Sequence, residues 1–166
     1  MHRSTFVLVV FAFALAGCAD ACGRACGNAA YNRTLAAEVE DWRFDGPRSE
    51  LEAAAAAALR ASRGASVPAD CFGPDGTCRV SHADEDWTLR VNDARGGFVL
   101  EASSVWGDGE PSDDPVLIVD AIARVDAAAA ERIRATASAA GERARSRTLR
   151  RCHAWREAVS EAGDAE

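Results

Sequence analysis

The chain has 166 residues, of which 26 are acidic and 19 are basic, so its formal net charge at neutral pH is −7. This excess of negative charge argues against a nucleic-acid partner, because general binding to nucleic acid depends on basic side chains that neutralise phosphates. The length suits one domain of ordinary size.

The N-terminus has the pattern of an export signal. His2 and Arg3 precede an apolar run from Phe6 to Ala16. A helix needs roughly 20 apolar residues to cross a bilayer, and this run is about half as long. A cleaved signal is therefore favoured over an uncleaved membrane anchor.

The end of this run, Leu15-Ala16-Gly17-Cys18, resembles the lipobox of bacterial lipoproteins. The resemblance implies that the Cys18 thiol receives a diacylglyceryl group and that the chain is cut directly before this cysteine. We therefore expect residues 1–17 to be a lipoprotein signal peptide and Cys18 to be the lipidation site. Several acyl chains, palmitate among them, would then hold the protein on a membrane without spanning it. Cleavage without lipidation, which would give a secreted protein, stays open as an alternative.

The residue after the lipidated cysteine bears on which membrane carries the anchor. In many Gram-negative bacteria an aspartate at this position retains a lipoprotein at the inner membrane, and the resemblance extends to this rule. Here the position is Ala19, and Asp20 lies one residue further on. The resemblance thus favours the cell outer membrane over the inner one, with the protein facing the periplasm.

The mature chain is expected to have three parts. Residues 18–33 are small and polar, with Gly23 and Gly27, and predict a lipidated N-terminus followed by a tether. A single α+β domain should span residues 34–160, and residues 161–166 should form a C-terminal tail.

The first expected elements of this domain are short. Trp42 and Phe44 alternate with charged residues and suggest a short strand within 38–44, with a helical turn over 35–41 as the alternative. A helix is predicted over 50–62, because Ser49 could cap its start and Gly64 follows the alanine-rich run.

A β-hairpin is the clearest tertiary feature of the sequence. Apolar and polar residues alternate over 87–92 and again over 98–106, and the intervening segment 93–97 contains Gly96 and Gly97, which tolerate the positive φ angles of a tight turn. Val80 should belong to a preceding edge strand.

The C-terminal half should contain a strand followed by a long helix. The apolar residues of 116–125 predict a further strand, and Asp126 is a suitable cap for a helix over 127–159. The resulting fold class is α+β: an antiparallel sheet of about four strands with a short helix and a long C-terminal helix packed on one face.

The cysteines fit an oxidising compartment. Cys71 and Cys78 enclose a Gly-Pro-Asp-Gly turn and should form a disulfide. Cys152 should pair with Cys22 or Cys26, which leaves one free thiol. A metal or haem site is not expected, because the spacing of these cysteines matches neither a zinc site nor a haem attachment motif. No cofactor is expected.

No catalytic constellation stands out. Ser81, His82 and Asp84 contain the residue types of a hydrolytic triad, but the sequence lacks a nucleophile elbow. The acidic loops 84–86 and 108–114 do not match the calcium-binding EF-hand loop. We therefore expect a protein without enzymatic activity.

The last helix carries a concentration of arginines in an otherwise acidic chain. Arg143, Arg147, Arg150 and Arg151 are the candidate partner surface, suited to anionic head groups, lipopolysaccharide or an acidic protein. Alternatively, glutamates of the same helix and the acidic loops balance this charge.

The sequence favours a lipid-anchored, non-enzymatic bacterial envelope protein that binds a protein or another envelope component through its periplasm-facing domain. One alternative is a small module whose Trp87, Phe98 and Trp106 enclose an apolar ligand. A second alternative is a secreted, soluble, disulfide-bonded protein.

Overall fold

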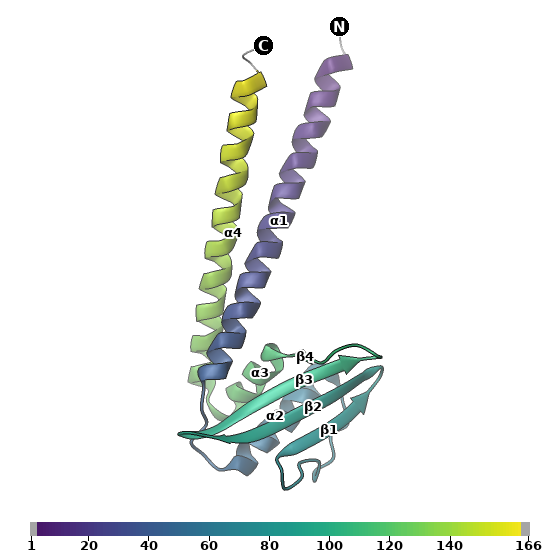
Figure 1. Cartoon of the computed structure of the whole chain (residues 1–166), viewed down its shortest axis with the longest axis vertical. Helices are drawn as coiled ribbons and strands as arrows, with labels where there is room; N and C mark the ends of the chain where they lie inside the picture. The colour runs from purple at the N-terminus through teal and green to yellow at the C-terminus, as the bar shows by residue number, and fades with distance from the viewer. Residues whose placement is uncertain (1–2, 164–166) are drawn as a thin grey trace. The chain divides into compact units, whose positions relative to one another are not determined.

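The computed structural model describes the backbone of residues 3–163 and the side chains of residues 21–155. The chain is α+β, as predicted: the described residues form four helices and one four-stranded sheet, whose arrangement Figure 1 shows. In chain order the elements are α1 (Arg3–Asp41), α2 (Arg48–Arg63), β1 (Thr77–His82), β2 (Glu85–Ala94), β3 (Gly97–Trp106), β4 (Ser112–Asp113), α3 (Pro115–Val125) and α4 (Ala127–Gly163).

The chain divides into two compact units, whereas the sequence predicted one domain over 34–160. The first unit combines residues up to 34 with residues from 137 onward, and the second unit is residues 35–136. The expected tether over 18–33 is helical, because it lies within α1. Its glycines allow the backbones of α1 and α4 to approach closely: a Cβ built on Gly27 would lie 3.2 Å from the carbonyl oxygen of Gly141.

The second unit is built on an antiparallel sheet with strand order β1-β2-β3-β4. The predicted hairpin is confirmed, since β2 and β3 pair along their whole length from Glu85↔Trp106 to Ala94↔Gly97. Gly96 and Gly97 have φ angles of 93° and 143°, which accounts for the two glycines at the turn. The expected edge strand around Val80 is β1, which pairs with β2.

One face of this sheet is covered by α2 and α3, which pack on one another and against the strands (Figure 1). Trp87, Leu89 and Val91 of β2 are buried on this face, and the intervening residues are more exposed. The helices contribute fully buried leucine and isoleucine side chains to the same core, namely Leu51, Leu59, Leu117 and Ile122.

Helix α2 confirms the prediction over 50–62, apart from its start. The helix begins at Arg48, and Pro47 is the N-cap without a side-chain hydrogen bond, so the expected cap at Ser49 is wrong. Proline fits the start of a helix because the missing N–H there has no partner within the helix. Gly64 ends α2 as expected, with a φ of 68° and an N–H that donates to Arg60 O at 3.0 Å.

Residues 115–125 form helix α3, so the strand predicted over 116–125 is wrong. Asp114 provides the physical reason, because its carboxylate accepts a hydrogen bond from Leu117 N–H at 2.9 Å and Pro115 follows it at the first helical position. The predicted cap at Asp126 is confirmed: its carboxylate accepts from Ala129 N–H at 2.9 Å at the start of α4.

The alternatives for residues 35–44 are resolved in favour of a helix, since α1 continues to Asp41. Phe44 then makes an isolated antiparallel bridge to Phe98 of β3. Phe44 N–H donates to Phe98 O at 3.0 Å, and Phe98 N–H donates to Phe44 O at 2.8 Å. The chain therefore reaches the sheet edge directly after the helix.

The long C-terminal helix is confirmed as α4, which extends to Gly163. Residues spaced by three or four along this helix form an apolar stripe, in which Ile133 and Ala137 are buried, Cys152 is half-buried and Trp155 is 61% exposed. The stripe thus becomes more exposed toward the C-terminus. Val159 lies outside the described side chains.

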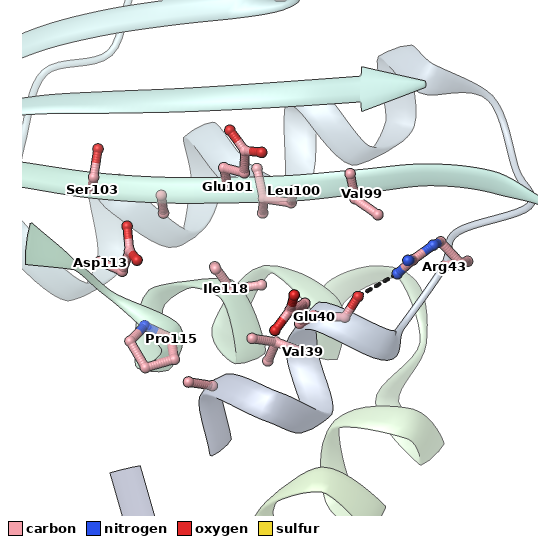
Figure 2. Close-up of a pocket in the computed structure, with 12 residues that line it drawn as sticks. Val39, Glu40, Arg43, Val99, Leu100, Glu101, Ser103, Asp113, Pro115 and Ile118 are labelled. Atoms are coloured by element: carbon pink, nitrogen blue, oxygen red, sulfur yellow. Dashed lines mark hydrogen bonds between the residues drawn. The ribbon is translucent and has the colours of Figure 1, made fainter. Parts of the chain in front are cut away.

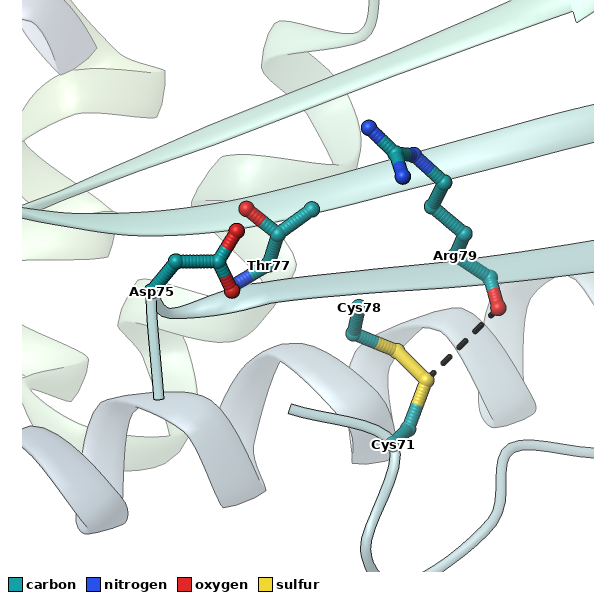
Figure 3. Close-up of a disulfide and its surroundings, with 5 residues drawn as sticks. All are labelled: Cys71, Asp75, Thr77, Cys78 and Arg79. Atoms are coloured by element: carbon teal, nitrogen blue, oxygen red, sulfur yellow. Dashed lines mark hydrogen bonds between the residues drawn. A yellow bond between two sulfur atoms is a disulfide. The ribbon is translucent and has the colours of Figure 1, made fainter. Parts of the chain in front are cut away.

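The predicted disulfide between Cys71 and Cys78 is confirmed (Figure 3). The Cα atoms lie 5.0 Å apart, within the range that the bond requires. In the enclosed turn, Thr77 N–H donates to the Asp75 carboxylate at 3.1 Å, and this hydrogen bond holds the pKa of Asp75 below its usual range. The disulfide attaches the loop before β1 to the buried start of that strand.

Candidate functional site

A groove runs along the edge of β3 in the second unit. Its volume is about 600 Å³, and its walls come from the last turns of α1, the strands β3 and β4, and the start of α3 (Figure 2). This volume falls in the range of pockets that bind small molecules or parts of peptides. The sequence did not predict the groove, because its walls come from elements that are distant in sequence.

The groove exists because β3 is covered only in part at this edge. Strand β4 pairs with Ser103 and Ser104, and Asp114 N–H donates to Ala102 O at 2.9 Å. At the other end, Phe44 pairs with Phe98. Between these two attachments, no strand in the described part of the chain lies beside this edge.

Leu100 lies in this uncovered stretch of β3. Backbone N–H and C=O groups of alternate residues in an antiparallel strand point to the same side. Since Phe98 and Ala102 are bonded on the edge side, the N–H and C=O of Leu100 also point away from β2. Among the described residues they have no backbone partner, so an incoming polar group can pair with them.

The bottom of the groove is apolar. Val39 from α1, Leu100 from β3 and Ile118 from α3 line it, and each side chain is less than a tenth exposed (Figure 2). Such a surface favours an apolar group of a ligand, because burying it removes apolar area from water.

Charged side chains surround the mouth of the groove. Glu40, Glu101 and Asp113 are exposed carboxylates, and no ion pair among the described residues involves them. The single arginine of the lining, Arg43, donates to the main-chain oxygens of Glu40 and Trp42, the latter at 2.7 Å. The mouth is therefore acidic and complements a positively charged group.

The aromatic residues proposed from sequence as a ligand-binding face do not gather around a cavity. Trp87 is 2% exposed and lies in the core, with the Arg63 guanidinium 5.2 Å from its ring centroid. Trp106 is 67% exposed. The prediction that Trp87 helps to enclose a ligand is thus wrong. The side chain lies on the face of β2 that the helices cover, so it is part of the core.

The residues of the incomplete triad are not arranged for catalysis. The Ser81 hydroxyl donates to the Asp86 carboxylate at 2.5 Å, across the pair of strands β1 and β2. His82 ends β1 and is half-buried. Ser81 is therefore engaged by a carboxylate rather than by a histidine.

The four predicted partner residues are exposed on α4 and are called the arginine surface below: Arg143, Arg147, Arg150 and Arg151. Two other arginines of the helix have contacts within the protein. Arg134 binds Asp120 at 2.9 Å and Glu131 at 3.4 Å. Arg145 lies against α1, where a Cβ built on Gly27 would be 3.4 Å from its Cβ.

Cys22, Cys26 and Cys152 are free thiols, so the pairing predicted for Cys152 is not formed. Cys22 and Cys26 lie one turn apart on α1. Charge on Cys26 and the hydrogen bond between the two thiols raise the pKa of Cys22, with smaller contributions from desolvation and from Cys152. The side chain of Cys18 lies outside the described residues.

Among the described residues, no group of three or more histidine, cysteine or acidic side chains could hold a metal ion. No helix within the same part of the chain is both long enough and apolar enough to cross a membrane.

Comparison with known proteins found no match: no family model, no curated protein sequence and no solved structure is similar to this chain.

Proposed function

We propose that this chain is a lipid-anchored, non-enzymatic protein of the bacterial envelope whose second unit binds a partner protein through the groove at the edge of β3. The lipobox around Cys18 supports the anchor, and its position after a short apolar run supports export. The groove carries the binding role, because it joins an uncovered strand edge to an apolar bottom and an acidic mouth.

The partner that fits this groove is an extended peptide segment with a basic side chain beside an apolar one. Its apolar side chain would contact Leu100 and Ile118, and its basic group would meet Asp113 and Glu101. A main-chain group of the segment would pair with Leu100, as in strand addition at a sheet edge. Only a short stretch of the β3 edge is uncovered, so the side chains of the bound segment must provide most of the specificity.

A small amphipathic ligand is the second candidate. The groove has enough volume for one, and a cationic group on such a molecule would meet the same carboxylates. A secreted, unanchored form remains the alternative if Cys18 is not modified.

The anchor is tested by the intact mass and detergent partitioning of the native protein expressed in a bacterial host. We expect the wild type to begin at Cys18, to carry acyl mass and to enter the detergent phase. Cys18→Ala should lack the acyl mass and remain in the aqueous phase, because the modified thiol is absent. An unmodified, water-soluble wild type would reject the anchor.

The groove is tested by placing a photo-crosslinking residue at Val99 in the anchored protein. We expect one protein adduct of defined mass at Val99 and none from the same residue at Arg79 of β1, on the far edge of the sheet. Glu101→Lys combined with Asp113→Lys should reduce the yield roughly tenfold, since each exposed ion pair contributes up to about 1 kcal/mol. An equal yield at Arg79, or no effect of the charge reversal, would contradict the proposal.

A further inference from the structure

The arginine surface covers one side of α4 in the first unit. At about 100° per residue, its four members fall within an arc of about 100° around the helix. All four side chains are exposed, and no ion pair within the described residues involves them. Four positive charges are therefore available to a partner on this side.

The packing of α1 against α4 fixes where this surface lies along the first unit. A Cβ built on Gly27 would lie 3.2 Å from Gly141 O, and one built on Gly23 would lie 3.3 Å from Leu149 Cγ. The two helices are thus antiparallel, as Figure 1 shows. Moving from Gly141 to Leu149 on α4 corresponds to moving from Gly27 back to Gly23 on α1, toward Cys18.

The arginine surface therefore runs beside the part of α1 that leads to the lipidation site. Arg145, at the same height, lies on the side of α4 that faces Gly23 and Gly27. The arginine surface lies on a different side of the helix, away from that packing, because Arg143 and Arg145 differ by two residues and hence by about 200°. The close packing of α1 on α4 therefore leaves the charges of the arginine surface accessible.

We propose that the arginine surface binds anionic phospholipid head groups of the membrane that holds the Cys18 anchor. Planar guanidinium groups donate paired hydrogen bonds to phosphate oxygens, and α4 carries four of them on one side. The inference rests on the proposed lipid anchor for its choice of lipid over an acidic protein, because the anchor brings this end of the first unit to a membrane surface. Acyl chains and a basic surface together give firmer attachment than either alone.

The test separates the arginine surface from the anchor. The probe is vesicles of phosphatidylglycerol mixed with phosphatidylcholine, compared with vesicles of phosphatidylcholine alone, and the protein is the mature chain, residues 18–166, with Cys18→Ala. We expect co-sedimentation with the anionic vesicles only, weakened by high salt because exposed charges are screened. Replacing all four residues of the arginine surface with glutamine should weaken this binding more than about tenfold, since each basic residue near an anionic leaflet contributes roughly fivefold.

A matched variant controls for net charge. Arg60, Arg79, Arg95 and Arg124 are exposed arginines of the second unit, and their replacement with glutamine changes the net charge by the same amount. This variant should bind anionic vesicles as the parent does. Absence of binding by the parent, or equal loss in both variants, would overturn the proposal. Either result is distinguishable from a failed anchor, which is measured by the acyl mass of the wild type.

Discussion

Replacing Trp87 with alanine is expected to lower the free energy of unfolding of the second unit by about 3–5 kcal/mol, the usual loss for a buried tryptophan. Trp87 is 2% exposed and lies between the sheet and its covering helices. Its ring also carries the Arg63 guanidinium, which binds Asp114 at the start of α3. Truncation would leave a cavity and remove this support. Urea unfolding followed by far-ultraviolet circular dichroism measures the loss.

Trp87→Phe is the matched control, because Nε1 of Trp87 is buried and has no hydrogen-bond partner among the described residues. An unpaired buried donor costs about 1–3 kcal/mol. Phenylalanine removes that donor while it keeps an aromatic ring beneath Arg63. We expect its loss of stability to be less than half that of Trp87→Ala. Equal losses for the two variants would show that the indole N–H is satisfied or that ring size dominates.

The features that the sequence predicted correctly are those in which a local pattern has one structural solution. Alternation over 87–92 and 98–106 with Gly96 and Gly97 between them specifies a hairpin, and β2 and β3 form it. The spacing of Cys71 and Cys78 around a tight turn specifies a short disulfide loop. In each case the pattern depends on residues close together in the chain.

The strand predicted over 116–125 failed because a short apolar run has no decisive period. Leu117, Ile118, Ala121 and Ile122 are buried at spacings that a helix satisfies. Asp114 followed by proline was the available signal, since this pair forms an N-cap and first helical position. The alanine-rich helix α2 packs against α3 rather than against a strand at this position.

The expected tether over 18–33 failed for a different reason. Glycines lower helix propensity in isolation, but tertiary packing overrides this preference where a partner backbone approaches. Gly23 and Gly27 are buried against α4, and their spacing of four residues places them on one side of α1. A sequence pattern cannot name the partner helix, which lies more than a hundred residues further along the chain.

The groove could not be predicted from the sequence, because its lining comes from four separate elements of the chain. Val39, Leu100 and Ile118 each fit the pattern of an ordinary core residue. Their shared opening arises only because β4 is too short to cover β3 and because Phe44 reaches the edge at Phe98.

Gly97→Ala is expected to lower the free energy of unfolding by about 2–5 kcal/mol, which combines the strain of a positive φ with the loss of two backbone hydrogen bonds. The φ angle of Gly97 is 143°, and a Cβ there would lie 2.1 Å from Phe44 O. Because this contact is with backbone, the Phe44 segment must move away and break its bridge to Phe98. Chemical denaturation measures the loss, and amide hydrogen exchange at Phe44 and Phe98 reports the bridge.

Gly96→Ala separates strain from collision, because Gly96 also has a positive φ but a Cβ there would meet nothing within 4 Å. We expect it to cost about 1–2 kcal/mol and to leave the exchange at Phe98 unchanged. Loss of the bridge should also free Arg43 and the wall of the groove beside it, so crosslinking at Val99 should fall in Gly97→Ala alone. Similar exchange at Phe44 in both variants would mean that the bridge survives the added Cβ, which would contradict the predicted collision. Unchanged crosslinking at Val99 despite loss of the bridge would mean that the groove owes its shape to α1 and α3.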